Sequence, residues 1–185
     1  MKYVGFNDEM IKILDSQINK EFECIIYEDS SGDNMCFGNL VLKVDGKLIE
    51  ISNYEDMDGW DEDYESAHFT CKYVDNYIPR VNNVGTKHID INETIQGINV
   101  IYDEVDDEFY KFNYDMAIEI VTDHHKYVIS RGYYYSEIIT ISVDKEMDEI
   151  YPVSQVIEDW QDDDTSIDVK VNRIKKNIKE RTNNN

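Results

Sequence analysis

Apolar and polar side chains alternate most regularly between residues 116 and 143, a pattern that predicts three antiparallel strands. Residues 116–121 alternate, the polar residues 122–125 fit a four-residue turn, and residues 126–130 alternate again in the return direction. Residues 137–143 form a third run rich in β-branched side chains, which favour strands. The pattern predicts one sheet whose apolar face is formed by Ile118, Ile120, Tyr127, Ile129, Ile139, Ile141 and Val143.

A second meander is predicted earlier in the chain. Residues 40–44 and 47–52 flank the dipeptide Asp45-Gly46, which readily adopts the positive φ angles of a type I′ hairpin turn. Residues 68–75 follow as a third strand after a long acidic segment. Pairing across the turn places on one face Leu40, Leu42, Val44, Ile49 and Ile51.

The two meanders resemble each other in sequence. Residues 68–75 align with residues 138–144 when one residue is skipped, and Ile26-Tyr27 upstream matches Ile101-Tyr102. We interpret the likeness as two copies of a unit of roughly fifty residues. The alternative is that any two antiparallel meanders look alike at this level, without a common origin.

An amphipathic helix is predicted at the start of the chain, from about residue 8 to 19. Asn7 is a good N-cap, and Asp8 and Glu9 occupy the first turn, where the helix dipole favours acids. Apolar residues then recur at helical spacing, namely Met10, Ile11, Leu14 and Ile18. The expected fold class is therefore α+β and mainly antiparallel β.

Turn-forming residues divide the chain between the two meanders. Pro79 and Gly85 indicate a linker, within which residues 90–97 could hold one helical turn. Towards the end, residues 150–157 fit an edge strand or a short helix, and residues 166–171 fit a last strand. The expected organisation is an N-terminal helix (1–20), a first β-meander unit (21–75), a linker (76–98), a second β-meander unit with an acidic loop (99–171), and a basic, partly disordered tail (172–185) in which a helix could form.

Charge is the most unusual property of the composition. Forty Asp and Glu residues against 18 Lys and Arg residues give a formal net charge of -22. The imbalance is uneven, because residues 170–185 contain six bases and one acid. A field of this sign repels nucleic acid and anionic membranes and attracts basic proteins, so we expect no direct nucleic-acid or membrane binding. The basic tail either lies against the acidic body or extends freely into solvent.

Two segments place a tryptophan among carboxylates. Aromatic residues surrounded by charge suit a protein interface, where the acids steer a basic partner and the aromatic rings supply buried area. We therefore predict that a partner is bound by Asp56, Asp58, Trp60, Asp61, Glu62, Asp63 and Tyr64 in the first segment and by Glu158, Asp159, Trp160, Asp162, Asp163 and Asp164 in the second. The structural alternative is that each tryptophan anchors its own loop.

Motifs of known catalytic or metal chemistry are mostly absent. The acidic segment 55–65 does not fit an EF-hand, because Gly59 comes too early for the calcium loop. An irregular divalent-cation site built from Asp56, Asp58, Asp61 and Asp63 remains an alternative. The triplet Asp123-His124-His125 is similar to the motif that names the DHH phosphoesterases, but it lies in a predicted hairpin turn and lacks that family's further aspartate motifs.

The three cysteines are odd in number and form no CxxC pair, so we expect reduced thiols, with Cys71 as a small buried apolar residue. The first residues contain no apolar stretch of signal-peptide length, and no run approaches the ~20 residues of a membrane span. A cytoplasmic location is expected.

Three functional classes follow from these features. The first is a non-enzymatic acidic protein, without cofactor or metal, that inhibits a basic partner, either as a nucleic-acid mimic acting on a nuclease or defence system, as in phages and mobile elements, or as an immunity protein against a toxin. The second is a divalent-metal-dependent enzyme or metal-binding module that uses the acidic loop 55–65. The third is a structural subunit that forms a homodimer through an exposed sheet edge. We favour the first.

Overall fold

The computed structural model describes residues 2–29, 33–55, 67–80, 85–107, 111–132, 136–161 and 168–181. Its elements, in chain order, are β1 (Lys2–Val4), α1 (Asp8–Asp15), β2 (Glu21–Glu28), β3 (Met35–Phe37), β4 (Asn39–Val44), β5 (Lys47–Glu55), β6 (Ala67–Val74), β7 (Thr86–Asp106), β8 (Lys111–Thr122), β9 (Lys126–Arg131), β10 (Ile138–Val143), α2 (Met147–Ile150), α3 (Val153–Gln161), β11 (Lys170–Asn177) and α4 (Ile178–Arg181).

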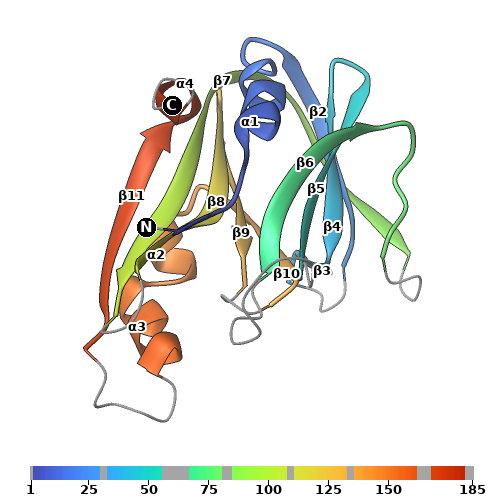
Figure 1. Ribbon diagram of the computed structural model, residues 1–185. Coiled ribbons are helices and arrows are strands. Elements are labelled where there is room, and N and C mark those ends of the chain that lie inside the picture. Colours follow the sequence, from blue (N-terminus) through green and yellow to red (C-terminus); the bar gives the residue numbers. More distant parts are fainter. Residues whose placement is uncertain are drawn as a thin grey trace.

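Within the described residues, eleven strands form one sheet in the order β3-β10-β9-β8-β7-β2-β4-β5-β6, with β11 and β1 added on β7 and β8. Every pairing is antiparallel except that of β1 with β8. The sheet folds over, so that the half with β7, β8 and β9 faces the half with β4, β5 and β6 (Figure 1). The predicted class, α+β with mainly antiparallel strands, is confirmed.

Both predicted hairpins are present with the expected register. Asp45 and Gly46 have φ angles of 47° and 71°, as a type I′ turn requires, and Leu42 lies opposite Ile49. In the second meander, Ile118 lies opposite Ile129. Local sequence fixed these pairings, because a shift of one residue would turn every apolar side chain to the wrong face.

Much of the predicted linker is part of the long strand β7. Residues 86–94 pair with β2 and residues 95–106 pair with β8, so one strand joins the two halves of the sheet. The expected linker 76–98, its helical turn and the unit boundary at 99 are therefore wrong from residue 86 onward. Two irregularities interrupt the alternation of this strand: Asn92 has a φ of 56°, and the register with β8 shifts between Ile95 and Gly97.

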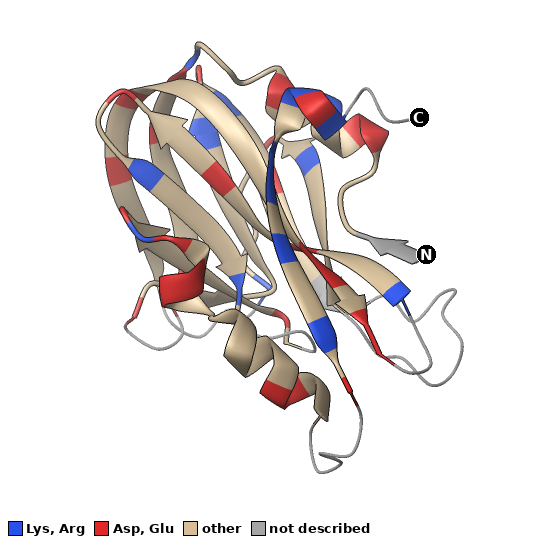
Figure 2. Cartoon of the chain, turned by 90° about the vertical axis from the view of Figure 1, so that its left-hand side faces the viewer, with Lys and Arg blue, Asp and Glu red and all other residues tan. Residues whose placement is uncertain are grey.

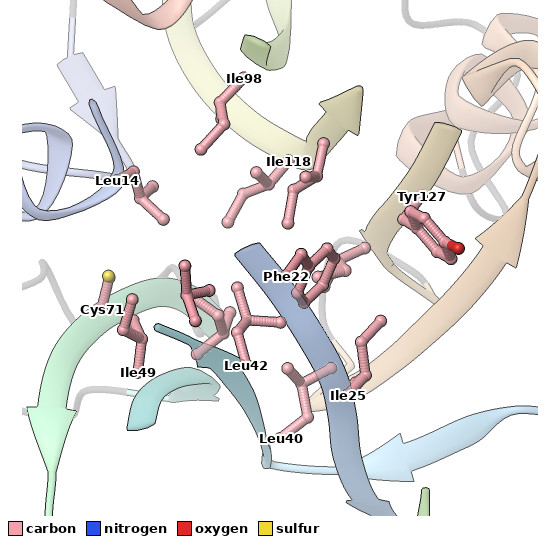
Figure 3. Close-up of a cluster of buried hydrophobic side chains, with 14 of the residues drawn as sticks. Leu14, Phe22, Ile25, Leu40, Leu42, Ile49, Cys71, Ile98, Ile118 and Tyr127 are labelled. Atoms are coloured by element: carbon pink, nitrogen blue, oxygen red, sulfur yellow. The ribbon is translucent and has the colours of Figure 1, made fainter. Parts of the chain in front are cut away.

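The main core lies between the two halves of the sheet and is closed at one end by α1. Side chains from both meanders and from the helix point towards one another (Figure 3). The residues less than 2% exposed include Leu14, Phe22, Ile25, Leu40, Ile49, Ile51, Phe69, Ile95, Ile98, Ile118, Ile120, Ile129 and Ile139. Fully burying one such side chain contributes about 1.5–3 kcal/mol, so this shared core holds the halves together. Val143, predicted on the same face, is instead 38% exposed at the end of β10.

The N-terminal helix begins where the sequence predicts. The Asn7 side chain accepts hydrogen bonds from the backbone N–H groups of Glu9 and Met10, both at 3.0 Å. The helix ends at Asp15, four residues earlier than expected, because the following turn bonds to β7: Asn19 N–H donates to the Ile95 carbonyl at 2.8 Å. The helix is thus docked by its backbone as well as by its buried side chains.

A second, smaller core covers the outer face of β7, β8 and β9. Helices α2 and α3 pack there, so the region expected as an edge strand or short helix is helical. Val156 from α3 is fully buried, and the cluster also contains Ile101, Val105, Phe112, Met116, Ala117, Val128, Met147 and Tyr151. The sheet half that contains β7–β9 therefore buries apolar side chains on both faces.

The basic segment near the end of the chain is a strand rather than a helix up to Asn177. Strand β11 pairs antiparallel with β7 from Lys170 opposite Asp106 to Asn177 opposite Asn99. The expected boundary at residue 172 therefore falls inside a strand, and only residues 178–181 are helical. Ladder hydrogen bonds to β7 outweigh the weak helical tendency of a charged segment.

The bases of this segment pair with buried carboxylates. The Arg173 guanidinium donates two hydrogen bonds to Asp103, at 2.8 and 2.7 Å, and the Asp103 side chain is fully buried. Lys175 Nζ lies 2.8 Å from Glu119 Oε2, and Arg181 Nη2 lies 2.9 Å from Asp115 Oδ1. The acidic half of the sheet thus receives much of its internal counter-charge from the last strand and helix.

Replacing Arg173 with Met should lower the free energy of unfolding by roughly 3–5 kcal/mol, because it leaves the Asp103 carboxylate buried without its cation. Urea unfolding followed by circular dichroism measures the loss. Lys170→Met is the matched control and should leave stability nearly unchanged, since Lys170 is 75% exposed and its ion pair among the described residues is with the exposed Asp168. Equal effects of the two substitutions would contradict a special role for the buried pair.

Candidate partner-binding surface

Most of the residues predicted to bind a partner lie outside the described residues. This applies to Asp56, Asp58, Trp60, Asp61, Glu62, Asp63 and Tyr64, and to Asp162, Asp163 and Asp164. The metal alternative at residues 55–65 falls almost wholly in the same segment. The structure fixes where that segment leaves and re-enters the sheet, at Glu55 in β5 and Ala67 in β6, which are paired with each other.

The second acidic segment is described up to Gln161, at the end of α3. Glu158 is exposed, as a partner-binding carboxylate should be. Asp159 is half-buried and accepts hydrogen bonds from Tyr151 Oη and, at 2.8 Å, from Gln155 Nε2. Trp160 is half-buried against Phe112, with ring centroids 5.1 Å apart. Two of the three residues thus have contacts within the molecule, and Trp160 contributes to the second core.

Strand β11 places basic residues beside the acidic residues of the sheet half that contains β7. Figure 2 shows Lys and Arg positions spaced along β11, with Asp and Glu positions on the elements beside it. Arg173 also donates to Asp148 of α2 at 2.8 Å, and Lys175 also contacts Glu146 at 3.1 Å. Arg173 and Lys175 therefore neutralise carboxylates of this molecule.

A polar hollow of about 280 Å³ opens beside the end of the β4–β5 hairpin that is remote from its turn. Its wall is formed by Gly38, Asn39, Glu50, Ser52 and Arg80. The Glu50 side chain is 12% exposed and accepts hydrogen bonds from Asn39 Nδ2 at 3.1 Å and from Ser52 Oγ at 3.2 Å. The hollow thus holds a carboxylate in a fixed orientation.

The hollow lies where the two halves of the sheet meet. Gly38 N–H donates to the Glu137 carbonyl at 3.0 Å, and the Gly38 carbonyl accepts from Asn53 N–H at 2.8 Å. Sequence reasoning missed this site, although one signal was available: Gly38 interrupts a run that would otherwise be a single strand. Its φ of 82° bends the chain from β3, which pairs with β10, into β4.

The turn that contains Asp123-His124-His125 joins β8 to β9, as predicted. His125 Nδ1 lies 2.8 Å from Asp144 Oδ2, and Nε2 lies 3.7 Å from Glu93 Oε1. The hydrogen bond to Asp144 raises the pKa of His125, and the negative charge of Glu93 acts in the same direction. The imidazolium is thus favoured by two carboxylates, Glu93 of β7 and Asp144, which follows β10. These contacts stabilise the turn.

The described part of the chain contains no group of side chains arranged to bind a metal ion, and its three cysteines are buried. No group of three or more His, Cys, Asp and Glu side chains within it has the arrangement needed to hold a metal ion. Cys24, Cys36 and Cys71 are buried free thiols, and burial raises the pKa of Cys36 and Cys71 to about 12. The prediction that Cys71 is a buried apolar residue is confirmed, since it is 3% exposed in the main core. No helix among the described residues is long and apolar enough to cross a membrane.

Replacing Asp144 with Asn should lower the pKa of His125 towards its ordinary value, because the neutral amide no longer favours the imidazolium. A histidine whose pKa is raised on folding adds stability below its unfolded pKa, and this contribution disappears as the pH rises through the folded value. Asn tolerates the positive φ of 56° at this position. NMR titration of the imidazole carbons measures the shift, and His88, which is exposed, serves as the internal control. An unchanged His125 titration would contradict the pairing.

Replacing Trp160 with Ala should lower the free energy of unfolding by roughly 1–3 kcal/mol, less than for a fully buried tryptophan, while folding remains cooperative. The cost comes from the contact with Phe112. Glu158→Ala is the control. Glu158 lies two residues before Trp160 on the exposed side of α3, so its replacement should be close to neutral. A Trp160 variant as stable as the control would show that the indole makes no useful packing contact.

Comparison of the chain with known protein families, with curated proteins and with solved structures found no match.

Proposed function

We propose that this chain is an acidic binding protein that inhibits or neutralises a basic partner protein. The observation that carries the proposal is the charge balance: 40 acids oppose 18 bases, and ion pairs inside the molecule remove equal numbers of each. The charge that remains is negative. Such a surface accelerates encounter with basic proteins and disfavours nucleic acid.

The partner we propose is a nuclease, a nucleic-acid-binding complex or a toxin. Proteins of these kinds carry basic surfaces that contact phosphates, and a rigid sheet can hold carboxylates where phosphates would lie. Same-face residues along a strand are ~6.8 Å apart, so strand ends and their loops can present carboxylates in a fixed row. The assignment to anti-defence or immunity proteins rests on analogy of composition and size.

Two further features belong to this proposal. We propose a cytoplasmic location, which is supported by three buried cysteines that remain free thiols. We also propose that the two meanders arose by internal duplication. Support comes from their equal layout, since β2, β4, β5 and β6 are neighbours in that order, as are β7, β8, β9 and β10.

The test is an affinity capture from host-cell lysate at low and at high salt, followed by titration of the purified partner. Retention of one stoichiometric basic protein, with an affinity that falls as salt rises, supports an inhibitor of a basic target. Inhibition of that partner's activity by an equimolar amount of this protein completes the test. Absence of any basic partner, together with a rise in melting temperature on adding Ca²⁺ or Mn²⁺, would favour the metal-dependent alternative.

Replacing Asp56, Asp58, Asp61 and Asp63 together with Asn should weaken partner binding by at least tenfold and flatten its salt dependence. The matched control carries the same charge change at exposed positions elsewhere, Asp33, Asp75, Asp90 and Asp168. A loss of affinity confined to the first variant locates the binding charge. Equal losses would mean that net charge alone steers the partner.

Trp60→Ala and Trp160→Ala should each weaken binding by more than ~1 kcal/mol, as expected for interface anchors. Because Trp160 also packs on Phe112, its variant is compared with Phe112→Leu, which alters the same packing but keeps the indole. A Trp160 effect no larger than that of Phe112→Leu would assign the residue to the core. Loss of the fold in both tryptophan variants would remove these residues from the proposed interface.

A further inference from the structure

We propose that the hollow lined by Gly38, Asn39, Glu50, Ser52 and Arg80 receives a lysine or arginine side chain of the basic partner. This inference rests on the proposed function and adds to it a specific contact point. At about 280 Å³, the hollow is just below the range of small-molecule sites, which suits one side chain better than a whole ligand.

The carboxylate of Glu50 is held in place before any partner arrives. Asn39 Nδ2 donates to Glu50 Oε2, and the same amide group donates to the Ile78 carbonyl at 2.9 Å. Asn39 Oδ1 in turn accepts from the backbone N–H of Arg80 at 3.2 Å. Because three hydrogen bonds fix the Asn39 side chain, the Glu50 carboxylate that it contacts is held as well. Glu50 therefore loses little conformational entropy when it binds a cation.

Glu50 retains the capacity to bind an incoming cation. Its partner within the chain is Lys72, at 3.1 Å, but the Lys72 side chain is 62% exposed. Because the Lys72 end of this pair is exposed to solvent, an incoming cation can replace it. The other cation of the hollow, Arg80, is directed to Glu137 at 2.8 Å, so its charge is balanced at the rim.

Two exposed apolar residues are close neighbours, by chain or by backbone hydrogen bond, of residues that line the hollow. Phe37, which precedes Gly38, is 41% exposed, and Ile78, whose carbonyl bonds to Asn39, is 70% exposed. These are two of the few large hydrophobic side chains exposed in the described part of the chain. Lysine and arginine have aliphatic stems that pack on such surface while the charged end reaches a carboxylate.

The shape of the hollow depends on a glycine. A Cβ at Gly38 would lie 2.5 Å from Arg80 Cδ, so a larger residue would displace the Arg80 side chain that lines the hollow. The positive φ at this position disfavours other residues as well. Gly38 thus permits both the bend from β3 to β4 and the close approach of the Arg80 side chain.

The direct test uses three model compounds, N-acetyl-lysine methylamide, N-acetyl-arginine methylamide and the uncharged N-acetyl-norleucine methylamide. Each is titrated into the ¹⁵N-labelled full chain, and amide shifts are followed by NMR. We expect the two cationic compounds to shift the signals of Gly38, Asn39 and Ser52, and norleucine to leave them unchanged. Equal shifts with norleucine, or none with any compound, would overturn the proposal.

Glu50→Gln should weaken binding of the cationic compounds about tenfold, because charge-assisted hydrogen bonds are lost. Glu21→Gln is the matched control: it removes the same charge at an exposed position near the hairpin turn, at the opposite end of β4 and β5, and should change affinity less than twofold. Ile78→Ser, at a residue too exposed to affect folding, should weaken binding without altering charge. Equal affinities of the Glu50 and Glu21 variants would overturn the proposal.

The same variants separate this inference from the proposed function. If a basic partner is captured and its affinity is unaffected by Glu50→Gln and Ile78→Ser, the proposed function stands and the hollow is not its contact point. If the model compounds bind in the hollow but no basic protein is captured, the cation site stands and the proposed function fails.

Discussion

Pairing of buried carboxylates with cations from the end of the chain is the interaction on which the structure depends most. Asp103, Asp115 and Glu119 lie in β7 and β8 with almost no exposure. Burial raises the pKa of Asp115, against the hydrogen bond from Phe6 N–H and the nearby Arg131 guanidinium. A buried carboxylate without a cation costs several kcal/mol, so β11 and α4 have to dock for this half of the sheet to be stable. A seemingly separate basic tail is therefore an integral part of the fold.

This internal pairing also shapes the surface. Arg173, Lys175 and Arg181 pair with carboxylates of β7, β8 and α2, and the whole chain keeps a formal net charge of -22. Long-range attraction for a basic partner then comes from the whole body, and specificity has to come from a few rigid contacts. The hollow around Glu50 supplies one such contact, because its carboxylate is oriented by Asn39 and Ser52.

The seam between the two halves explains why the hollow occurs where it does. Strand β7 links the halves on one side, and the Gly38 bend links β3 and β4 on the other, where Asn53 Nδ2 also reaches the Ser136 carbonyl at 2.8 Å. Arg131 lies nearby, with its guanidinium over the rings of Phe69 and Tyr114 at 5.0 and 4.1 Å. Where the two halves of the sheet meet, a gap is left, and mostly polar side chains line it.

Sequence by itself determined the features that depend on neighbouring residues: the Asp45-Gly46 turn, the β8–β9 hairpin, the Asn7 cap and the apolar faces of both meanders. Each follows from local turn chemistry or from a period of two or 3.6 residues. Tertiary structure decided the continuity of β7 through Asn92, the conversion of the basic tail into a strand, the packing of Trp160 on Phe112 and the assembly of the hollow. These depend on contacts between residues far apart in the chain, such as Arg173 with Asp103 or Asn39 with Ile78, and no local pattern encodes which distant groups will meet.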